Sequence, residues 1–290
     1  MPETWRDVEG DGGVRLCVRV VDDAGRSVPT LVLHHGLASS QHIWDLMLPR
    51  LARRFRVVTY DARGHGRSAK PATGYGFTAV VADALAVIGA TRSRRPLVVG
   101  HSWGAMVALE FAARHPRSVA GAVFVDGGIA PVGEGRPWRE VREALAPPPL
   151  AGMPVEVFRR SMPSFWGEAL AITPEIEAIV LEVMHVQRDG TIRPRLSRKN
   201  HLRILRAIWE QDPLALHGRL RVPALAIAAE SSRDANETER EHAKRQTTRA
   251  LRAAGAPTRV TWIRGIHDLP LQHPGELTRQ IERFARTAVG

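Results

Sequence analysis

The sequence predicts an α/β protein with a mostly parallel sheet of about eight strands and helices on both faces. Short runs of branched apolar residues recur along the chain, and segments with the apolar spacing of a helix stand between them. In such an alternation each helix returns the chain to the same edge of the sheet, so the strands pair in parallel and are covered on both faces. The 290 residues suffice for one large domain that carries an insertion.

The first part of the chain shows this alternation clearly. Apolar runs predict strands at 14–21, 28–36, the start of 54–68, 96–100 and 119–128. Apolar residues three and four apart predict helices at 77–90 and 103–114. The strand that begins at 54 runs into a glycine-rich turn, and the strand at 96–100 is followed by a helix, as a doubly covered parallel sheet requires.

The alternation stops near residue 130 and returns near residue 218. Between them lies a passage rich in proline and then three segments with helical spacing, at 155–162, 173–187 and 199–211. Strands at 222–230 and 258–265 and helices at about 237–254 and 275–287 complete the chain. We therefore expect a core formed by 1–130 and 218–290, with a helical insertion at 131–217.

Composition and charge exclude some function classes. The formal net charge is +11, but the arginines are scattered, with no basic tract interleaved with aromatic residues, which favours a solvated surface over a nucleic-acid groove. Attraction to acidic partners or substrates stays open. The single cysteine, Cys17, permits no disulfide within the chain. Without an apolar leader or a run of about 20 apolar residues, we expect a cytoplasmic protein with no membrane partner.

The most informative motif is Gly100-His101-Ser102-Trp103-Gly104, between a predicted strand and a predicted helix. A hydroxyl between two glycines at such a joint is typical of a nucleophile elbow. The glycines remove side chains where neighbouring backbone passes closely. The turn lifts the serine hydroxyl above the sheet and places it beside the free N–H groups of the following helix. This spacing predicts that Ser102 is a nucleophile.

The chain resembles the α/β-hydrolase family over nearly its whole length. Four segments in a fixed order carry the resemblance, namely LHHG at 33–36, DARGHGRS at 61–68, GHSWG at 100–104 and GIHDLPLQHP at 265–274. The resemblance implies that the insertion at 131–217 is a helical cap after the sixth strand. It also implies an oxyanion hole formed by the backbone N–H groups of Leu37 and Trp103.

The resemblance further implies a histidine base after the last strand and an acid that orients it. His267 directly follows that strand and is the predicted base, whereas His273 is a less well placed rival. The usual acid position after the strand at 222–230 holds Ser232, so the acid is expected elsewhere. Asp126, after the sixth strand, takes an alternative position used by some lactonases and by haloalkane dehalogenases of the family. Asp234 and Glu230 stay open as alternatives.

Together these residues predict a serine hydrolase that cleaves a carboxylic ester or lactone with a hydrophobic part, through a Ser102–His267–Asp126 triad and an acyl-enzyme. The resemblance implies that epoxide hydrolases and haloalkane dehalogenases use a carboxylate nucleophile, which Ser102 is not. Three alternatives stay open: a carbon–carbon bond hydrolase, a cofactor-free haloperoxidase and a ligand-binding relative without turnover. No metal-ligand cluster or dinucleotide loop is present in the sequence, so no cofactor is expected. The oligomeric state stays open, a homodimer included.

The expected cap contains several large apolar side chains that can line a substrate pocket or form the cap's own core. They are Met153, Phe158, Met162, Phe165, Trp166, Met184 and Trp209.

Overall fold

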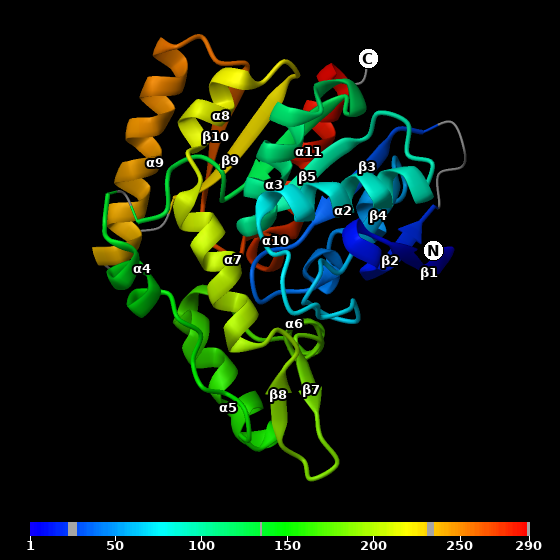
Figure 1. Cartoon of the computed structure of the whole chain (residues 1–290), viewed down its shortest axis with the longest axis vertical. Coiled ribbons are helices and arrows are strands. Elements are labelled where there is room, and N and C mark those ends of the chain that lie inside the picture. The colour runs from blue at the N-terminus through cyan, green and yellow to red at the C-terminus, as the bar shows by residue number, and fades with distance from the viewer. Residues whose placement is uncertain (23–27, 134, 231–234, 289–290) are drawn as a thin grey trace.

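A computed structural model describes residues 1–22, 28–133, 135–230 and 235–288. Its main feature is an eight-stranded sheet in the order β1-β2-β4-β3-β5-β6-β9-β10, which confirms the predicted fold class (Figure 1). From β4 to β10 all neighbouring strands pair in parallel, and β1 and β2 are antiparallel. The strands are β1 (Glu3–Glu9), β2 (Arg15–Val21), β3 (Thr30–His34), β4 (Arg56–Tyr60), β5 (Leu97–His101), β6 (Gly121–Val125), β9 (Ala224–Glu230) and β10 (Thr258–Arg264).

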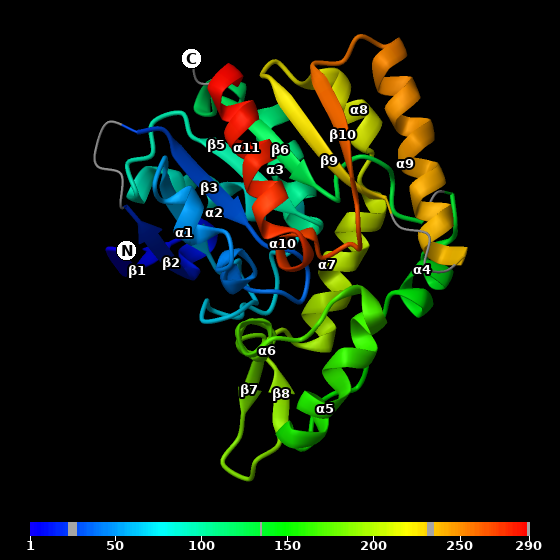
Figure 2. The same ribbon diagram turned by 180° about the vertical axis from the view of Figure 1, so that it is seen from behind.

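Helices cover both faces of this sheet. One face carries α2 (Phe77–Ala90), α3 (Trp103–Arg114) and α8 (Pro213–Arg219), as Figure 1 shows. The opposite face carries α1 (Leu48–Leu51), α10 (Leu269–Gln272) and α11 (Pro274–Ala288), and is seen in Figure 2. Because successive strand residues point to opposite faces, each strand contributes to two separate cores. On β5, Val98 lies in the core under α2 and α3, whereas Leu97 and Val99 lie in the core under α11.

The chain between β6 and β9 is largely helical, and the part at 138–194 extends away from the sheet (Figures 1 and 2). It begins with α4 (Trp138–Ala144) and α5 (Val155–Trp166), continues through α6 (Pro174–Leu181) and ends with α7 (Arg198–Glu210) and α8. The last of these, α8, packs against α3 and α9 (Ala235–Ala253) beside the sheet. The division into a core and a cap at 131–217 stays a prediction.

The hairpin at 184–194 and strand β1 differ from the sequence prediction. The helix expected over 173–187 ends at Leu181, and the chain then forms an antiparallel hairpin of β7 (Met184–Val186) and β8 (Ile192–Pro194). Asp189 accepts a hydrogen bond from the Thr191 N–H at 2.9 Å, and Gly190 has a φ of 78°, which together make the tight turn that the helical pattern hid. Strand β1 was also unexpected, because nearly all of its side chains are exposed and its sequence lacks an apolar run.

None of the described helices has the length and apolar character that crossing a membrane would require.

Candidate active site

Ser102 lies at the turn that joins β5 to α3, as the motif predicts. Its backbone has φ 55° and ψ −119°, a conformation that residues with a side chain rarely adopt. Two hydrogen bonds hold this strained turn, because the Ser102 N–H donates to the Val125 carbonyl at 2.8 Å and the Ala105 N–H donates to the Ser102 carbonyl at 3.0 Å. The strain places the serine at the carboxyl edge of the sheet, at the first turn of α3.

The two glycines of the motif are required by close backbone contacts. A Cβ at Gly100 would collide with the carbonyl group of Gly104, and a Cβ at Gly104 would lie 2.6 Å from the His35 carbonyl oxygen. These neighbours are backbone atoms and cannot turn aside as a flexible side chain can. The sequence therefore needs glycine on both sides of Ser102 for β3, β5 and α3 to approach this closely.

Replacing Gly100 by alanine should lower the free energy of unfolding by about 2–4 kcal/mol, because the new methyl overlaps the backbone of α3. Urea denaturation would measure the change. Gly89→Ala is the matched control, since a Cβ at Gly89 in helix α2 meets nothing within 4 Å; it should be neutral or stabilising by up to about 1 kcal/mol. If Gly100→Ala stays within about 0.5 kcal/mol of the parent chain, the close contact is relieved more easily than the geometry indicates.

The structure brings Ser102, His267 and Asp126 into one chain of hydrogen bonds. The Ser102 Oγ–H donates to His267 Nε2 at 2.8 Å, and His267 Nδ1–H donates to Asp126 Oδ2 at 2.6 Å. These residues come from the ends of β5, β10 and β6, which are separated in the sequence and meet at one edge of the sheet. The distances are those of a nucleophile, a base and an orienting acid.

The loop that carries His267 is fixed from two sides. The buried ring of His101 donates from Nε2 to the His267 carbonyl at 2.9 Å. The Ile266 N–H donates to Gln272 Oε1 at 2.7 Å. These bonds hold the backbone of the loop, while 49% of the His267 side chain stays exposed. The imidazole is therefore positioned and still accessible to a substrate.

Asp126 is buried and strongly stabilised as a carboxylate. Only 3% of its side chain is exposed. Burial would raise the pKa of Asp126, but the charge of Lys244 and then the hydrogen bond to His267 outweigh it and hold that pKa well below its ordinary value. Asp126 is therefore ionised at neutral pH and can face a charged imidazole.

The pKa of His267 is raised above its ordinary value of 6.5. Burial of part of the ring acts to lower the pKa, and the hydrogen bond and charge of Asp126, with the charge of Asp268, outweigh it. Lys244 acts in the lowering direction. The nearby carboxylates thus favour the imidazolium that forms when the ring takes a proton.

The two alternative residues that the structure describes, Glu230 and His273, do not join this chain. Glu230 pairs instead with Arg245 of α9. The backbone of His273 lies at the junction of α10 and α11, where its carbonyl accepts from the Leu277 N–H at 3.0 Å. Asp234 lies outside the described residues. The structure thus places the carboxylate of Asp126, rather than that of Glu230, within hydrogen-bond distance of the His267 ring.

Leu37 and Trp103, the two predicted oxyanion donors, lie in segments next to Ser102. Trp103 N–H is at the first turn of α3, directly after Ser102, and Leu37 follows Gly36, whose Cβ position would be 3.2 Å from the Ser102 Cβ. Within the described part of the chain neither N–H donates to a protein acceptor. His35 shapes the first of these segments, since its Nδ1–H donates to the Gly36 carbonyl at 2.7 Å and its Nε2 accepts from the Ala62 N–H at 3.0 Å.

Two further residues touch this site: Lys244, which the sequence does not indicate, and Trp166, which it indicates only as one of the apolar side chains of the expected cap. Lys244 Nζ lies 2.6 Å from Asp126 Oδ1. Trp166, at the end of α5, donates from Nε1 to Asp268 Oδ2 at 2.7 Å, directly beside His267. Neither residue belongs to a motif, and each contact joins positions more than a hundred residues apart. Only the folded arrangement reveals them.

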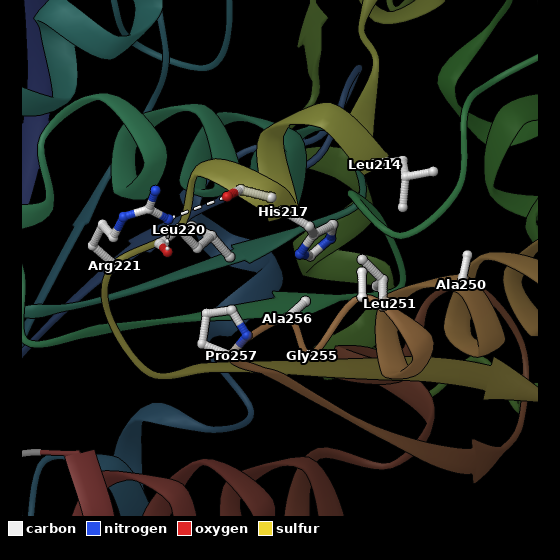
Figure 3. A pocket seen from close by; sticks show the side chains of 11 residues that line it. Leu214, His217, Leu220, Arg221, Ala250, Leu251, Gly255, Ala256 and Pro257 are labelled. Atoms are coloured by element: carbon white, nitrogen blue, oxygen red, sulfur yellow. Dashed lines mark hydrogen bonds between the residues drawn. The ribbon is translucent and has the colours of Figure 1, made fainter.

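A separate cavity of about 400 Å³ lies between α8, the end of α9 and the start of β10 (Figure 3). Its lining includes His217, whose ring bonds to the Gly128 carbonyl and to Thr258 Oγ1, both at 2.8 Å. Ser102, Asp126 and His267 do not line it. Among the side chains that the structure describes, no group of three or more His, Cys, Asp or Glu residues is arranged to hold a metal ion.

The sequence model of the alpha/beta hydrolase fold matches residues 29–248, more than half of the chain. The strand order and the elbow agree with it, and the protein belongs to the alpha/beta hydrolase family.

Relatives in this family differ in the chemistry that their names describe. The chain is 37% identical to EphD of Mycobacterium tuberculosis (strain ATCC 25618 / H37Rv), named as an oxidoreductase, over 48% of this chain but only 26% of EphD. It is 30% identical to RutD of Yersinia enterocolitica, which its name assigns to carbamate hydrolysis, over 69% of each protein. A crystal structure of E-2-(acetamidomethylene)succinate hydrolase matches 98% of this chain and all of its own, with a TM-score of 0.77 and 23% identity. That last likeness concerns the fold alone.

Proposed function

We propose that the protein is a serine hydrolase that cleaves a carboxylic ester or lactone with a hydrophobic part. One observation carries the proposal: the continuous hydrogen-bond chain from Ser102 through His267 to Asp126. Ser102 is a serine rather than a carboxylate, so the covalent intermediate that fits it is an acyl ester.

The proposed reaction has two halves. Ser102 Oγ attacks the carbonyl carbon while His267 Nε2 takes the hydroxyl proton, and the N–H groups of Leu37 and Trp103 stabilise the oxyanion. His267 then donates the proton to the leaving alkoxide, which departs as an alcohol and leaves the acyl-enzyme. Water, deprotonated by His267, attacks that ester and releases the carboxylic acid and free Ser102. Asp126 holds the imidazole in the tautomer that this sequence needs.

The hydrophobic part of the substrate is inferred from the end of α5. Phe158, Met162 and Met184 are buried in the insertion's own core with Ile192. Trp166, in contrast, bonds to Asp268 beside His267, and its neighbour Phe165 is 44% exposed. An aromatic edge next to the base suits an apolar acyl or alcohol group.

The test is a panel of p-nitrophenyl esters with acetyl, butyryl and octanoyl groups, together with an aliphatic and an aromatic lactone. Saturable hydrolysis of at least one of them by the parent chain supports the proposal. Bromination of a dye with peroxide and acetate, run in parallel, would reveal haloperoxidase chemistry. Absence of hydrolysis across the panel by folded protein would contradict an ester or lactone hydrolase.

The pH dependence of hydrolysis should follow His267. The base must be neutral to accept the Ser102 proton, so activity falls as pH drops through its pKa. Because that pKa is raised above 6.5, the acid limb of kcat/KM should have its midpoint above 6.5. A profile from pH 5 to 9 on an activated ester measures it. A midpoint clearly below 6.5 would contradict the electrostatic description of the site.

A further inference from the structure

Lys244 makes a close contact with Asp126 that no sequence motif predicts. It lies on α9, which packs beside β9. Its ammonium is 2.6 Å from Asp126 Oδ1, and the side chain is only 16% exposed. A lysine withdrawn from water normally needs a specific partner, and here the partner is the carboxylate that holds the candidate base.

The two oxygens of Asp126 have separate partners. Oδ1 accepts from Lys244 Nζ and from the Ala229 N–H, at 2.6 and 2.7 Å, while Oδ2 accepts from His267 Nδ1 at 2.6 Å. Two donors on Oδ1 fix the rotation of the carboxylate group. Oδ2 is thereby directed at His267.

We propose that Lys244 is a positioning residue, which orients the Asp126 carboxylate toward His267 and whose positive charge limits how strongly Asp126 favours the imidazolium. Without that charge, the carboxylate of Asp126 would stabilise the protonated form of His267 more strongly. The base would then be protonated, and inactive, over a wider range of pH. Lys244 thus keeps Asp126 ionised while leaving His267 neutral enough to accept a proton. The consequence for catalysis rests on the proposed function, whereas the effect of Lys244 on the protonation of His267 does not.

Several other charged or titratable groups surround the pair, and their charges act with that of Lys244. On α9 they are Arg245 and Glu241; on β9, Glu230; on β5, His101; and after β10, Asp268. Arg245 pairs with both Glu230 and Glu241, so its charge is largely balanced locally. The ammonium of Lys244, in contrast, directly contacts Asp126.

The test measures the pKa of His267 by NMR in histidine-labelled protein, with His267→Asn to assign the signal. Burial, and then the charge of His267, lowers the pKa of His101 to about 4, so its signal changes at lower pH than that of His267. Lys244→Met should raise the pKa of His267 by about 0.5–1 unit, because a nearby like charge is removed. Lys244→Arg keeps the charge and should stay within about 0.3 unit of the parent. Arg249→Met, which removes an exposed charge from the same helix, should leave the pKa unchanged.

A second readout connects the shift to the chemistry. The rate at which a fluorophosphonate labels Ser102 should show its acid limb displaced to higher pH in Lys244→Met and restored in Lys244→Arg. If Lys244→Met does not fold, as judged by circular dichroism, Lys244→Gln replaces it, with the same expected direction. An unchanged or lowered His267 pKa in the folded variant, or an equal shift in Lys244→Arg, overturns the proposal. If the parent chain resists labelling altogether, the proposed function fails, and the NMR result still decides the role of Lys244.

Discussion

Replacing Ser102 by alanine should reduce ester hydrolysis by a factor of about 10⁴ or more, the largest effect expected of any single substitution. The hydroxyl is the only group in the hydrogen-bond chain that can form an acyl ester, and alanine leaves His267 and Asp126 with nothing to activate. The substitution removes only the hydrogen bond from the Ser102 hydroxyl to His267, and the backbone hydrogen bonds that hold the strained turn at φ 55° stay. The free energy of unfolding should therefore change little while kcat collapses. Steady-state kinetics on the best ester of the panel would measure the loss.

Ser118→Ala is the matched control for that experiment. Ser118 lies in the turn after α3, at the end remote from the elbow, and its N–H bonds to the His115 carbonyl at 2.9 Å. It should keep parental activity. Ester hydrolysis by Ser102→Ala within tenfold of the parent would show that another group is the nucleophile.

The second large effect is expected for Asp126→Asn, which should lower kcat by about 10³–10⁴-fold. An amide is nearly the same size as the carboxylate, but its NH₂ group can face His267 Nδ1 and favour the wrong tautomer. It also leaves the ammonium of Lys244 without its counter-charge. We expect a modest loss of stability and a severe loss of turnover, measured by urea denaturation and by kinetics.

Glu230→Gln separates Asp126 from its sequence alternative. Glu230 bonds to Arg245 at the surface and not to His267, so its amide should keep nearly full activity. If Glu230→Gln were the inactive variant and Asp126→Asn the active one, the assignment of the acid would be reversed.

The sequence predicts the parallel core because alternation and apolar runs are local signals of burial. Strands β5 and β6 are buried on both faces and read as continuous apolar runs. Strand β1 gives no such signal, since it is an exposed edge strand. The sequence does not predict the hairpin of β7 and β8, because a helical apolar pattern continues past Leu181 into it. A turn at Gly190 decides the local structure there.

The sequence predicts the site residues that belong to a motif or directly follow a predicted strand. It does not predict residues that reach the site only through tertiary packing. The glycine spacing marks Ser102, and position after a predicted strand marks His267 and Asp126. Lys244 and Trp166 carry no such mark. Their contacts depend on how α9 packs on the sheet and how α5 meets the loop after β10. The sequence allows Asp126, Asp234 or Glu230 as the acid, because the strand register alone does not show which carboxylate points toward His267.

The proposed function requires that Ser102 is an activated nucleophile with a formed oxyanion hole. Treatment with a fluorophosphonate, followed by intact mass and peptide mapping, tests it without knowledge of the substrate. We expect one added phosphonyl group per chain, on the peptide containing Ser102, and none in Ser102→Ala or in heat-denatured protein. Folded parent protein that stays unlabelled, or that is labelled at another residue, would contradict it.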